Sequence, residues 1–366
     1  MTSEPITAGS IVGIVGAGIM GAGIAQVALE AGSEVILHDV DPEAVERATA
    51  RIADGLGRRA AKLGLDADTI EGWADGRMSR FRHSPTLDGI AAEADLVIEA
   101  VIEDLALKSA VFRTLDAESD ARTILATNTS ALSVGAIAEA TADPERVIGL
   151  HFFNPVPLMP LVEVVPTPET SDDVIDRATA IVRSWGKTPI RSADRPGFIV
   201  NRVNRPFTLE ALRMLEEGVA TVDSIDTAVR GAGYPMGPFE LMDLAGLDVN
   251  LAAAEGVWAG LGRPDRLRPS PIQERLVASG NLGRKSGRGF YHYDDGRRGT
   301  VDEAFATSDQ EPVLAAGTIV GRIEAAIATE ARLAVDEQVA SEADIDAALR
   351  LGAGHPKGPF EKGSSG

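Results

Sequence analysis

The sequence predicts an α/β domain with a doubly wound parallel sheet, followed by a mainly α-helical domain and a partial repeat of that helical domain. Three observations predict this arrangement. Apolar runs of strand length alternate with helical patterns over about the first 195 residues, which is typical of a parallel sheet. The first strand leads into a G-x-G-x-x-G motif at the start of a helical pattern. From Phe198 onward long helical patterns dominate, and part of this pattern recurs 120 positions later.

The glycine motif predicts a dinucleotide site. Gly16 permits a tight turn, Gly18 lets the backbone approach a pyrophosphate, and Gly21 lets the helix pack closely on the strand. The next strand, Glu34–Asp39, ends in an acidic residue that can accept hydrogen bonds from a ribose. Asp39 would repel a 2′-phosphate, and no arginine follows it directly. The motif therefore predicts a Rossmann-type domain with NAD, rather than NADP, as its cofactor.

The other elements of the first domain follow from hydrophobic patterning. Strands are expected at Ile11–Val15, Glu34–Asp39, Ala94–Ala100, Thr123–Asn128, Arg146–Phe153, Leu161–Val165 and Thr188–Ser192. Helices are expected at Pro42–Leu63, Ile102–Ala117, Ala131–Ala142 and Asp172–Ser184, with a further helix and loops in segment 64–80. A cofactor lies beyond the carboxyl ends of such strands, which is where we find Glu99, Glu103, Asn128, Ser130 and His151.

The domain boundaries follow from changes in composition. We expect an NAD-binding domain at 1–195, because Pro196–Gly197 marks a break. Helical segments at Phe198–Glu217 and Val222–Gly231 open a substrate and dimerisation domain at 196–295. A polar linker is expected at 296–310 and the partial repeat at 311–366. The terminal GSSG resembles a flexible tail or an engineered remnant and is excluded from the fold.

The internal repeat is specific. Nine residues between Gly197 and Arg230 recur 120 positions later, among them Arg202, Glu210 and Glu217 as Arg322, Glu330 and Glu337. After a slip of one residue, Tyr234–Glu240 recurs as His355–Glu361, which preserves a P-x-G-P-F-E loop. Chance similarity between two helices would not reproduce that loop as well. The second copy lacks the equivalent of Leu241–Tyr293, so it is a partial duplication.

Composition excludes several classes of function. The 366 residues include no cysteine, which excludes disulfides, thiolate catalysis and cysteine-ligated metals and fits a cytoplasmic protein. We identify no metal site. The net charge of −20 argues against general nucleic-acid binding. No apolar run approaches the ~20 residues of a membrane span, and the N-terminus has no signal-peptide pattern.

Two strands carry a candidate acid–base pair. His151 lies before the proline-rich segment centred on Pro157, and Glu163 lies after it at the same separation. If the strands form an antiparallel hairpin, the two side chains fall opposite one another. A carboxylate beside an imidazole fixes its tautomer and raises its basicity, which suits a general base near neutral pH. A histidine in an apolar run is by itself more often a buried, hydrogen-bonded core residue than a catalytic one. The paired glutamate makes the catalytic interpretation the favoured one.

Other polar residues have two interpretations each. Asn128 and Ser130 are placed to hydrogen-bond a substrate oxygen, or to cap the helix expected near Ala131. Both roles can hold together. The basic residues at the end of the long helix are either a solvated face or a phosphate-binding patch; they are Arg58, Arg59 and Lys62.

Together these motifs closely resemble the short-chain L-3-hydroxyacyl-CoA dehydrogenases, including 3-hydroxybutyryl-CoA dehydrogenases, over about Ile11 to Tyr293. The motifs are GAGIMGAGIA at 16–25, NTS at 128–130, HFFNPVPLMPLVEV at 151–164, PGFIVNR at 196–202 and GYPMGPFELMD at 233–243. The resemblance implies fatty-acid metabolism of the β-oxidation type with an acyl-CoA substrate. It leaves open the direction of the reaction, the acyl chain length and whether the acyl group is dicarboxylic.

The resemblance also implies residue roles. His151 and Glu163 match a dyad that takes the proton from the C3 hydroxyl while hydride passes to the nicotinamide. Ser130 and Asn201 match the substrate-contacting residues, and Lys62 matches a lysine that meets the CoA phosphates. The cofactor contacts match Gly16, Gly18, Ile19, Met20, Gly21, Asp39, Glu103, Lys108, Ser130, Asn154 and Lys285. Without the resemblance, Lys108 and Lys285 would equally fit exposed, solvated lysines.

Three departures from the family pattern bear on these roles. Gly55 stands where the family's CoA site has a serine. The second copy has Gly321 in place of Asn201 and Lys357 in place of Met236, so it resembles a structural repeat and not a second active site.

The resemblance also bears on the oligomeric state, because the family's helical domain usually dimerises. The chain is therefore expected to form either a homodimer or an internal pseudo-dimer through its repeat.

Rival functions are weighed against the same residues. A hydroxyacid dehydrogenase of the lens-crystallin type would bind no CoA, and the basic residues near Lys62 favour CoA over it. A reductase with a catalytic lysine in its helical domain is disfavoured by the dyad. A non-catalytic cofactor-binding or structural protein would have no need of the four residues His151, Glu163, Ser130 and Asn201.

Overall fold

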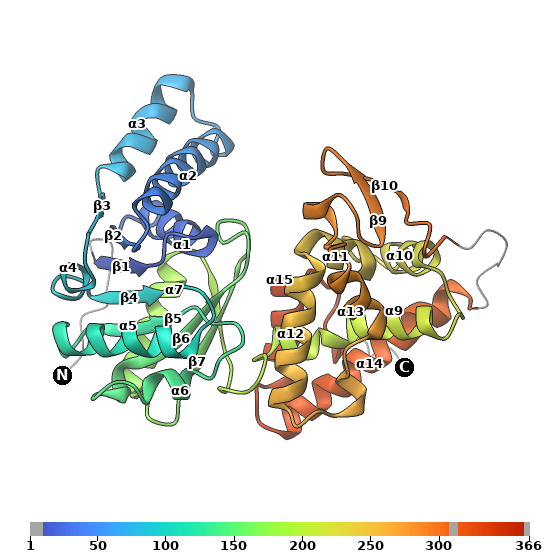
Figure 1. Ribbon diagram of the computed structural model, residues 1–366. Coiled ribbons are helices and arrows are strands. Elements are labelled where there is room, and N and C mark those ends of the chain that lie inside the picture. Colours follow the sequence, from blue (N-terminus) through green and yellow to red (C-terminus); the bar gives the residue numbers. More distant parts are fainter. Residues whose placement is uncertain (1–9, 307–313, 362–366) are drawn as a thin grey trace. The chain divides into compact units, whose positions relative to one another are not determined.

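The computed structural model describes residues 10–306 and 314–361 (Figure 1). Contacts between residues divide the chain into two compact units, Met1–Arg195 and Pro196–Gly366. The terminal GSSG lies outside the described residues. Within the described part of the chain, no helix is long and apolar enough to cross a membrane.

The first unit is built on an eight-stranded sheet in the order β3-β2-β1-β4-β5-β6-β7-β8. The strands are β1 (Ile11–Val15), β2 (Glu34–His38), β3 (Phe81–His83), β4 (Leu96–Glu99), β5 (Ile124–Thr127), β6 (Val147–Phe152), β7 (Leu161–Pro166) and β8 (Thr188–Arg191). Pairing is parallel from β3 to β6, β7 runs antiparallel to β6, and β8 runs parallel to β7. The order reverses between β1 and β4, so the predicted doubly wound sheet is confirmed and its switch point lies where a cofactor binds.

Helices cover this sheet and extend beyond it (Figure 1). They are α1 (Ile19–Glu30), α2 (Pro42–Lys62), α3 (Ala67–Met78), α4 (Leu87–Ala91), α5 (Leu105–Glu118), α6 (Val134–Ala138) and α7 (Asp172–Ser184), with a 3-10 turn at Pro144–Arg146. Helix α2 begins where Asp41 accepts a hydrogen bond from the Glu43 N–H and Pro42 occupies the first turn. Helix α1 is buried continuously from Gly21 to Leu29 because β1, β2 and α2 all pack against it.

Two expectations for the first unit are corrected. The short strand β3 follows α3, where the sequence predicted only a helix and loops. The helix expected at Ala131–Ala142 is limited to α6, because Ser133 caps it by accepting from the Ala136 N–H. The carboxylate of Asp194 accepts from the next two N–H groups, of Val134 and Gly135, and fixes this start.

The second unit is mainly helical. It comprises α8 (Val200–Val203), α9 (Arg205–Glu216), α10 (Val222–Gly231), α11 (Pro238–Ala245), α12 (Leu247–Gly260), α13 (Pro271–Ala278), α14 (Ala316–Asp336) and α15 (Glu342–Ala353). It also contains 3-10 turns at Asp265–Leu267 and Arg284–Ser286 and a hairpin of β9 (Tyr291–Asp294) and β10 (Arg297–Val301). The helix expected at Phe198–Glu217 is divided at Asn204, because Pro206 lies in the first turn of α9 and offers no N–H to a continuous helix.

The expected polar linker at 296–310 is wrong over its first half. Asp295 and Gly296 both have positive φ, of 44° and 72°, and form the two-residue turn between β9 and β10. Asp-Gly is the strongest short hairpin signal in a sequence, so this element was predictable. The segment is then anchored to the unit by Asp302, which accepts from Arg288, and by the ring of Phe305, 5.1 Å from that of Phe290.

The P-x-G-P-F-E loop carries structure in both copies. Asp226 of α10 accepts hydrogen bonds from the Phe239 and Glu240 N–H groups, and Asp346 of α15 accepts from Phe360 N–H. A Cβ at Gly237 would lie 2.2 Å from the Asp226 carboxylate, and one at Gly358 would lie 2.1 Å from Asp346. The glycine therefore recurs because an aspartate occupies the space of its side chain.

The repeat packs on the first copy through reciprocal ion pairs. Arg202 donates to Glu330 at 2.8 Å and to Glu337 at 2.7 Å. The counterpart Arg322 donates to Glu210 at 2.7 Å and to Glu217 at 2.8 Å. An arginine of each copy thus pairs with the same two glutamates of the other copy. Such reciprocal contacts are typical of an interface with twofold symmetry. The second unit thus contains an internal pseudo-twofold arrangement of α8–α10 and α14–α15.

Removing the buried charge of this interface is expected to destabilise the second unit. Glu330 is 1% exposed and accepts from both Arg202 and Arg266. Glu330→Gln leaves these guanidinium groups short of a counter-charge and should lower the free energy of unfolding by ~3 kcal/mol. The control Glu303→Gln removes a carboxylate that is 79% exposed and should change little. Urea denaturation of both variants measures the difference, and equal effects would contradict the buried-pair argument.

Candidate active site

The loop between β1 and α1 has the backbone geometry of a dinucleotide site. Gly16 has φ +108°, and a Cβ there would lie 2.6 Å from the Ala100 carbonyl oxygen. A Cβ at Gly21 would lie 1.8 Å from the Gly16 carbonyl oxygen, whereas one at Gly18 would meet nothing within 4 Å. Two glycines are therefore required by packing, and the third leaves the backbone open to a ligand. Asp39 lies beside this loop, since its Oδ2 accepts from the Ala17 N–H at 2.7 Å.

A charged network lies at the end of β4. Glu99 is completely buried and accepts from Lys108 Nζ at 2.7 Å and from Thr127 Oγ1 at 2.8 Å. Lys108 is 1% exposed and also lies 3.3 Å from Glu103 Oε2, so it is not a solvated lysine. Burial by itself raises the pKa of Glu103, but the Lys108 charge and hydrogen bonds from Ser130 and Thr129 lower it overall. Glu103 is therefore held as a carboxylate at the carboxyl edge of the sheet.

The residues after β5 connect this network to β6. Asn128 Oδ1 accepts from the Phe152 N–H at 2.9 Å, which ties the end of β5 to β6. Ser130 donates to Glu103 Oε1 through its N–H at 2.7 Å and through its hydroxyl at 3.2 Å. The expected helix-capping role of Asn128 and Ser130 is wrong, because the helix begins only at Val134 and Ser133 is its cap. In the turn before that helix, Thr129 Oγ1 accepts the hydrogen bonds from the N–H groups of Ala131 and Leu132.

His151 and Glu163 form the predicted pair. They are directly opposite in the antiparallel register of β6 and β7. His151 Nδ1 lies 2.6 Å from Glu163 Oε2, and the two side chains are 7% and 0% exposed. An Nδ1–H that donates to the carboxylate makes Nε2 the basic nitrogen of the ring. The Phe153 ring, 4.5 Å from the imidazole, adds an apolar neighbour. This geometry suits a general base.

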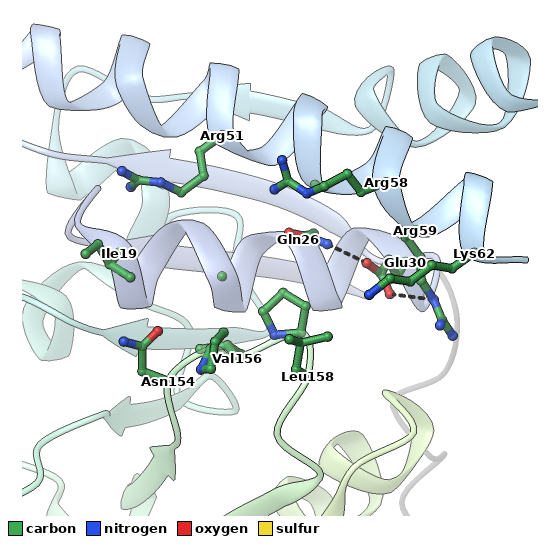
Figure 2. Close-up of a pocket in the computed structure, with 14 residues that line it drawn as sticks. Ile19, Gln26, Glu30, Arg51, Arg58, Arg59, Lys62, Asn154, Val156 and Leu158 are labelled. Atoms are coloured by element: carbon green, nitrogen blue, oxygen red, sulfur yellow. Dashed lines mark hydrogen bonds and ion pairs between the residues drawn. The ribbon is translucent and has the colours of Figure 1, made fainter. Parts of the chain in front are cut away.

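A pocket of about 250 Å³ lies between α1, α2 and the loop after β6 (Figure 2). Four basic side chains of α2 line it: Arg51, Arg58, Arg59 and Lys62. Glu30 of α1 accepts from Gln26 Nε2 at 2.7 Å and lies 3.5 Å from Arg59 Nε, so it neutralises part of this charge. The basic residues thus line a pocket, although the Arg58 and Arg59 side chains are 63% and 50% exposed. Their role as a phosphate-binding patch stays a prediction.

Gly55 has a defined role in this pocket. A Cβ at Gly55 would lie 2.1 Å from Gln26 Oε1. The glycine therefore leaves room for the Gln26 amide, which sits where a serine at position 55 would otherwise reach. The sequence pattern gave no indication that Gln26 lies in this pocket, because it is surrounded in the sequence by apolar residues of a buried helix.

The proline-rich loop that forms the other wall is fixed by a residue that sequence reasoning missed. Lys187 Nζ donates to the carbonyl oxygens of Val156 at 2.6 Å and Met159 at 2.8 Å. Burial lowers the pKa of Lys187. The loop carries Asn154, which also lines the pocket. A lysine before a short edge strand gave no signal of this role.

Two predicted site residues belong to the second unit. Asn201 lies in α8. Lys285 lies in a 3-10 turn and pairs with Asp248 at 2.6 Å, which lowers the pKa of that carboxyl. Their predicted contacts with substrate and cofactor stay predictions.

One acidic cluster of the second unit brings potential metal ligands together, namely His292, Asp302 and Glu303. Arg288 donates to both carboxylate oxygens of Asp302, at 2.5 and 3.2 Å. The cluster is therefore already neutralised by a cation of the chain.

Comparisons with known proteins agree with this geometry. A family model described as "3-hydroxyacyl-CoA dehydrogenase, NAD binding domain" matches residues 11–195. The model of the C-terminal domain of the same family matches residues 197–293 and again 317–364. The chain is 37% identical to 3-hydroxyadipyl-CoA dehydrogenase of Escherichia coli, with 96% of this chain and 90% of the relative covered. It is 43% identical to a probable 3-hydroxybutyryl-CoA dehydrogenase of Bacillus subtilis, with 77% and 96% covered.

A solved structure extends the likeness to the whole fold. The crystal structure of 3-hydroxybutyryl-CoA dehydrogenase from Escherichia coli K12 superposes with a TM-score of 0.87 at 37% identity. The match covers 97% of this chain and 91% of that one, so it includes the second copy of the helical segment.

Proposed function

This chain belongs to the 3-hydroxyacyl-CoA dehydrogenase family, and on that premise we propose how its own residues carry out the reaction. It is an NAD-dependent dehydrogenase that oxidises 3-hydroxyacyl-CoA to 3-oxoacyl-CoA. The observation that carries the proposal is the 2.6 Å contact between His151 Nδ1 and Glu163 at the carboxyl edge of the NAD-binding sheet.

His151 is the general base. NAD, when bound, accepts the hydride that leaves C3 of the substrate. Nε2 of His151 takes the proton of the C3 hydroxyl, and the buried Glu163 carboxylate stabilises the imidazolium that results. In the reverse direction the same nitrogen returns the proton. The antiparallel register fixes the imidazole before substrate binds, so little reorganisation is needed.

The cofactor site is formed by the loop after β1 and the neighbouring strand ends. The open backbone at Gly18 admits the pyrophosphate, and Asp39 accepts from the adenosine ribose. Ser130, which Glu103 orients, contacts the reacting end of the substrate and the nicotinamide. The remaining residues that we assign to NAD are Gly16, Ile19, Met20, Gly21, Glu103, Lys108, Asn154 and Lys285.

The pocket on α2 binds the phosphates of CoA. Its four basic side chains supply local positive charge that the chain as a whole, at −20, does not. This local charge favours an acyl-CoA substrate over the free hydroxy acid of a lens-crystallin type enzyme. Relatives are named for a butyryl acyl group, which ends in a methyl, and for an adipyl group, which ends in a carboxylate. We take both as candidate substrates.

The repeat supplies an internal partner. Reciprocal pairs such as Arg202–Glu330 and Arg322–Glu210 form the kind of interface that two identical chains form about a twofold axis. Residues in one chain meet at an effective concentration of about millimolar for a short flexible linker. We therefore propose that α14 and α15 cover the face that a second chain would use.

Loss of the base is the direct test of the dyad. His151→Gln should lower kcat for 3-hydroxybutyryl-CoA by ~10²–10⁴-fold while leaving NAD binding unchanged. Absorbance of NADH measures the rate, and protein fluorescence quenching measures NAD binding.

The Glu163→Gln variant should have a lower kcat and a shifted pH–rate profile, since a neutral amide does not favour imidazolium. A His151→Gln enzyme with near-normal kcat would refute the assignment, and activity on free 3-hydroxy acids equal to that on CoA thioesters would favour the rival enzyme.

Lys62→Ala is expected to weaken acyl-CoA binding selectively. Because the side chain is exposed, KM for acyl-CoA should rise by up to about 5-fold, with KM for NAD unchanged. The rise should shrink as salt increases, because exposed charge pairs are screened. The control Arg47→Ala removes a charge from α2 at a position that pairs with Asp41 outside the pocket. If acyl thioesters that lack the nucleotide respond equally to Lys62→Ala, the residue does not bind CoA phosphate.

The internal partner is tested by mass in solution. Light scattering should find the full chain monomeric. A chain ending at Ala306 keeps the β9–β10 hairpin but lacks α14 and α15, so it should dimerise or aggregate through the exposed face. Two equally stable dimers would show that the repeat is an appendage.

A further inference from the structure

Two buried arginines in neighbouring helices differ in whether a carboxylate pairs with them. Arg202, in α8, is completely buried and donates to Glu330 and Glu337. Burial lowers its pKa, but these two carboxylates raise it overall. Arg205, three residues later at the start of α9, is 7% exposed. Among the described residues no carboxylate pairs with it, and its Nε has no hydrogen-bond partner.

An uncompensated buried cation is costly. Moving an ionised group out of water is unfavourable unless a counter-charge and hydrogen bonds replace the lost hydration. Burial lowers the pKa of Arg205 to about 10 and is the sole cause of that shift, so the group still carries its charge at neutral pH. An apolar side chain would fill the same space without that cost. The arginine is therefore explained best by an anion that is bound during function.

Comparison of the two copies of the repeat separates residues of α8 and α9 that the fold requires from residues that it does not. Arg202 recurs as Arg322 with its own pair of glutamates, so it belongs to the pseudo-twofold interface. Asn201 and Arg205 do not recur, since their counterparts are Gly321 and the exposed Ala325. Helix α14 forms without either side chain. Neither the helix nor the pairing of the copies requires an arginine at position 205.

Asn201 in α8 and Arg205 at the start of α9 lie four positions apart, on either side of the break at Asn204. The backbone of Asn204 stays in the right-handed helical region (φ −82°, ψ −7°), so the two positions remain about one helical turn apart. Four residues rise by roughly 6 Å along a helix, which is the length of roughly five carbon–carbon bonds in an extended acyl chain, because each bond of ~1.5 Å advances the zigzag by roughly 1.25 Å. Asn201 is the residue that family resemblance assigns to the substrate near its reacting carbon. A group that binds at Arg205 would thus be separated from C3 by only a short piece of acyl chain.

We propose that Arg205 binds the terminal carboxylate of a dicarboxylic 3-hydroxyacyl-CoA whose acyl chain has about six carbons. A guanidinium can donate two parallel hydrogen bonds to a carboxylate, which gives both affinity and orientation. The other anionic groups of the reactants, the phosphates of CoA and NAD, have proposed sites of their own on the first unit. The inference rests on the proposed function and names its substrate class.

The test compares two substrates that differ only at the far end of the chain. 3-Oxoadipyl-CoA ends in a carboxylate, and 3-oxohexanoyl-CoA of equal length ends in a methyl. With NADH, the wild-type enzyme should prefer 3-oxoadipyl-CoA. Arg205→Gln should lower kcat/KM for that substrate by about 10- to 100-fold, mainly through KM, and should abolish the preference. Arg205→Lys should give an intermediate loss, because it keeps the charge without the bidentate geometry.

Three further measurements distinguish binding from a structural role. The control Arg275→Gln removes an exposed charge from α13 and should leave the preference intact. The melting temperature of ligand-free Arg205→Gln should not fall, since a buried charge without a partner is removed. Inhibition by free CoA should be the same in the wild type and in Arg205→Gln; a weaker inhibition in the variant would assign Arg205 to the nucleotide and overturn the proposal.

The outcomes separate this proposal from the one on which it rests. A wild type that reduces both substrates equally well would overturn the role of Arg205 and leave the dehydrogenase assignment standing. An equal loss on both substrates in Arg205→Gln, together with a lower melting temperature, would make the residue structural. A wild type that reduces neither substrate, nor acetoacetyl-CoA, would contradict the dehydrogenase assignment itself.

Discussion

The reversal of the chain between β6 and β7 is the constraint on which the candidate site depends. A parallel sheet brings strand ends to one edge, but an antiparallel step is needed to place Glu163 directly beside His151. The connecting loop does a second job, because it forms a wall of the pocket under α2. Lys187 holds that loop through two carbonyl oxygens. One fixed segment therefore couples the acid–base pair to the proposed nucleotide pocket.

The second unit shows how a duplicated segment can divide structural from chemical roles. Residues that hold the copies together, such as Arg202 and its counterpart Arg322, occur in both. The aspartate and glycine that form the P-x-G-P-F-E loop also occur in both, because each glycine makes room for its aspartate. Asn201 and Arg205 occur in the first copy alone. A repeat thus serves as an internal control for which positions the fold requires.

Much of the fold followed from local patterns, and the failures have identifiable causes. The glycine motif, the alternating elements and the register of His151 with Glu163 were predictable, since each depends on spacing along the chain. The β9–β10 hairpin differs from the predicted linker although Asp295–Gly296 is a strong turn signal, because the charged residues around that turn are equally typical of a linker. The late start of α6 at Val134 was not predictable from Asn128 and Ser130, which are good capping residues by type, because Asp194, some 60 positions away, helps to fix that start.

The sequence by itself determined the sheet apart from its short strand β3, the glycine loop, the dyad and the existence of a repeat, because local periodicity and short motifs encode these features. Only the tertiary structure decided which charges have partners. Lys108 reads as an exposed lysine and is buried between two glutamates. Arg202 and Arg205 look alike in the sequence, yet one has carboxylates 128 and 135 positions away and the other has none among the described residues. Compensation of a buried charge depends on groups that are distant in the chain, and no local pattern records them.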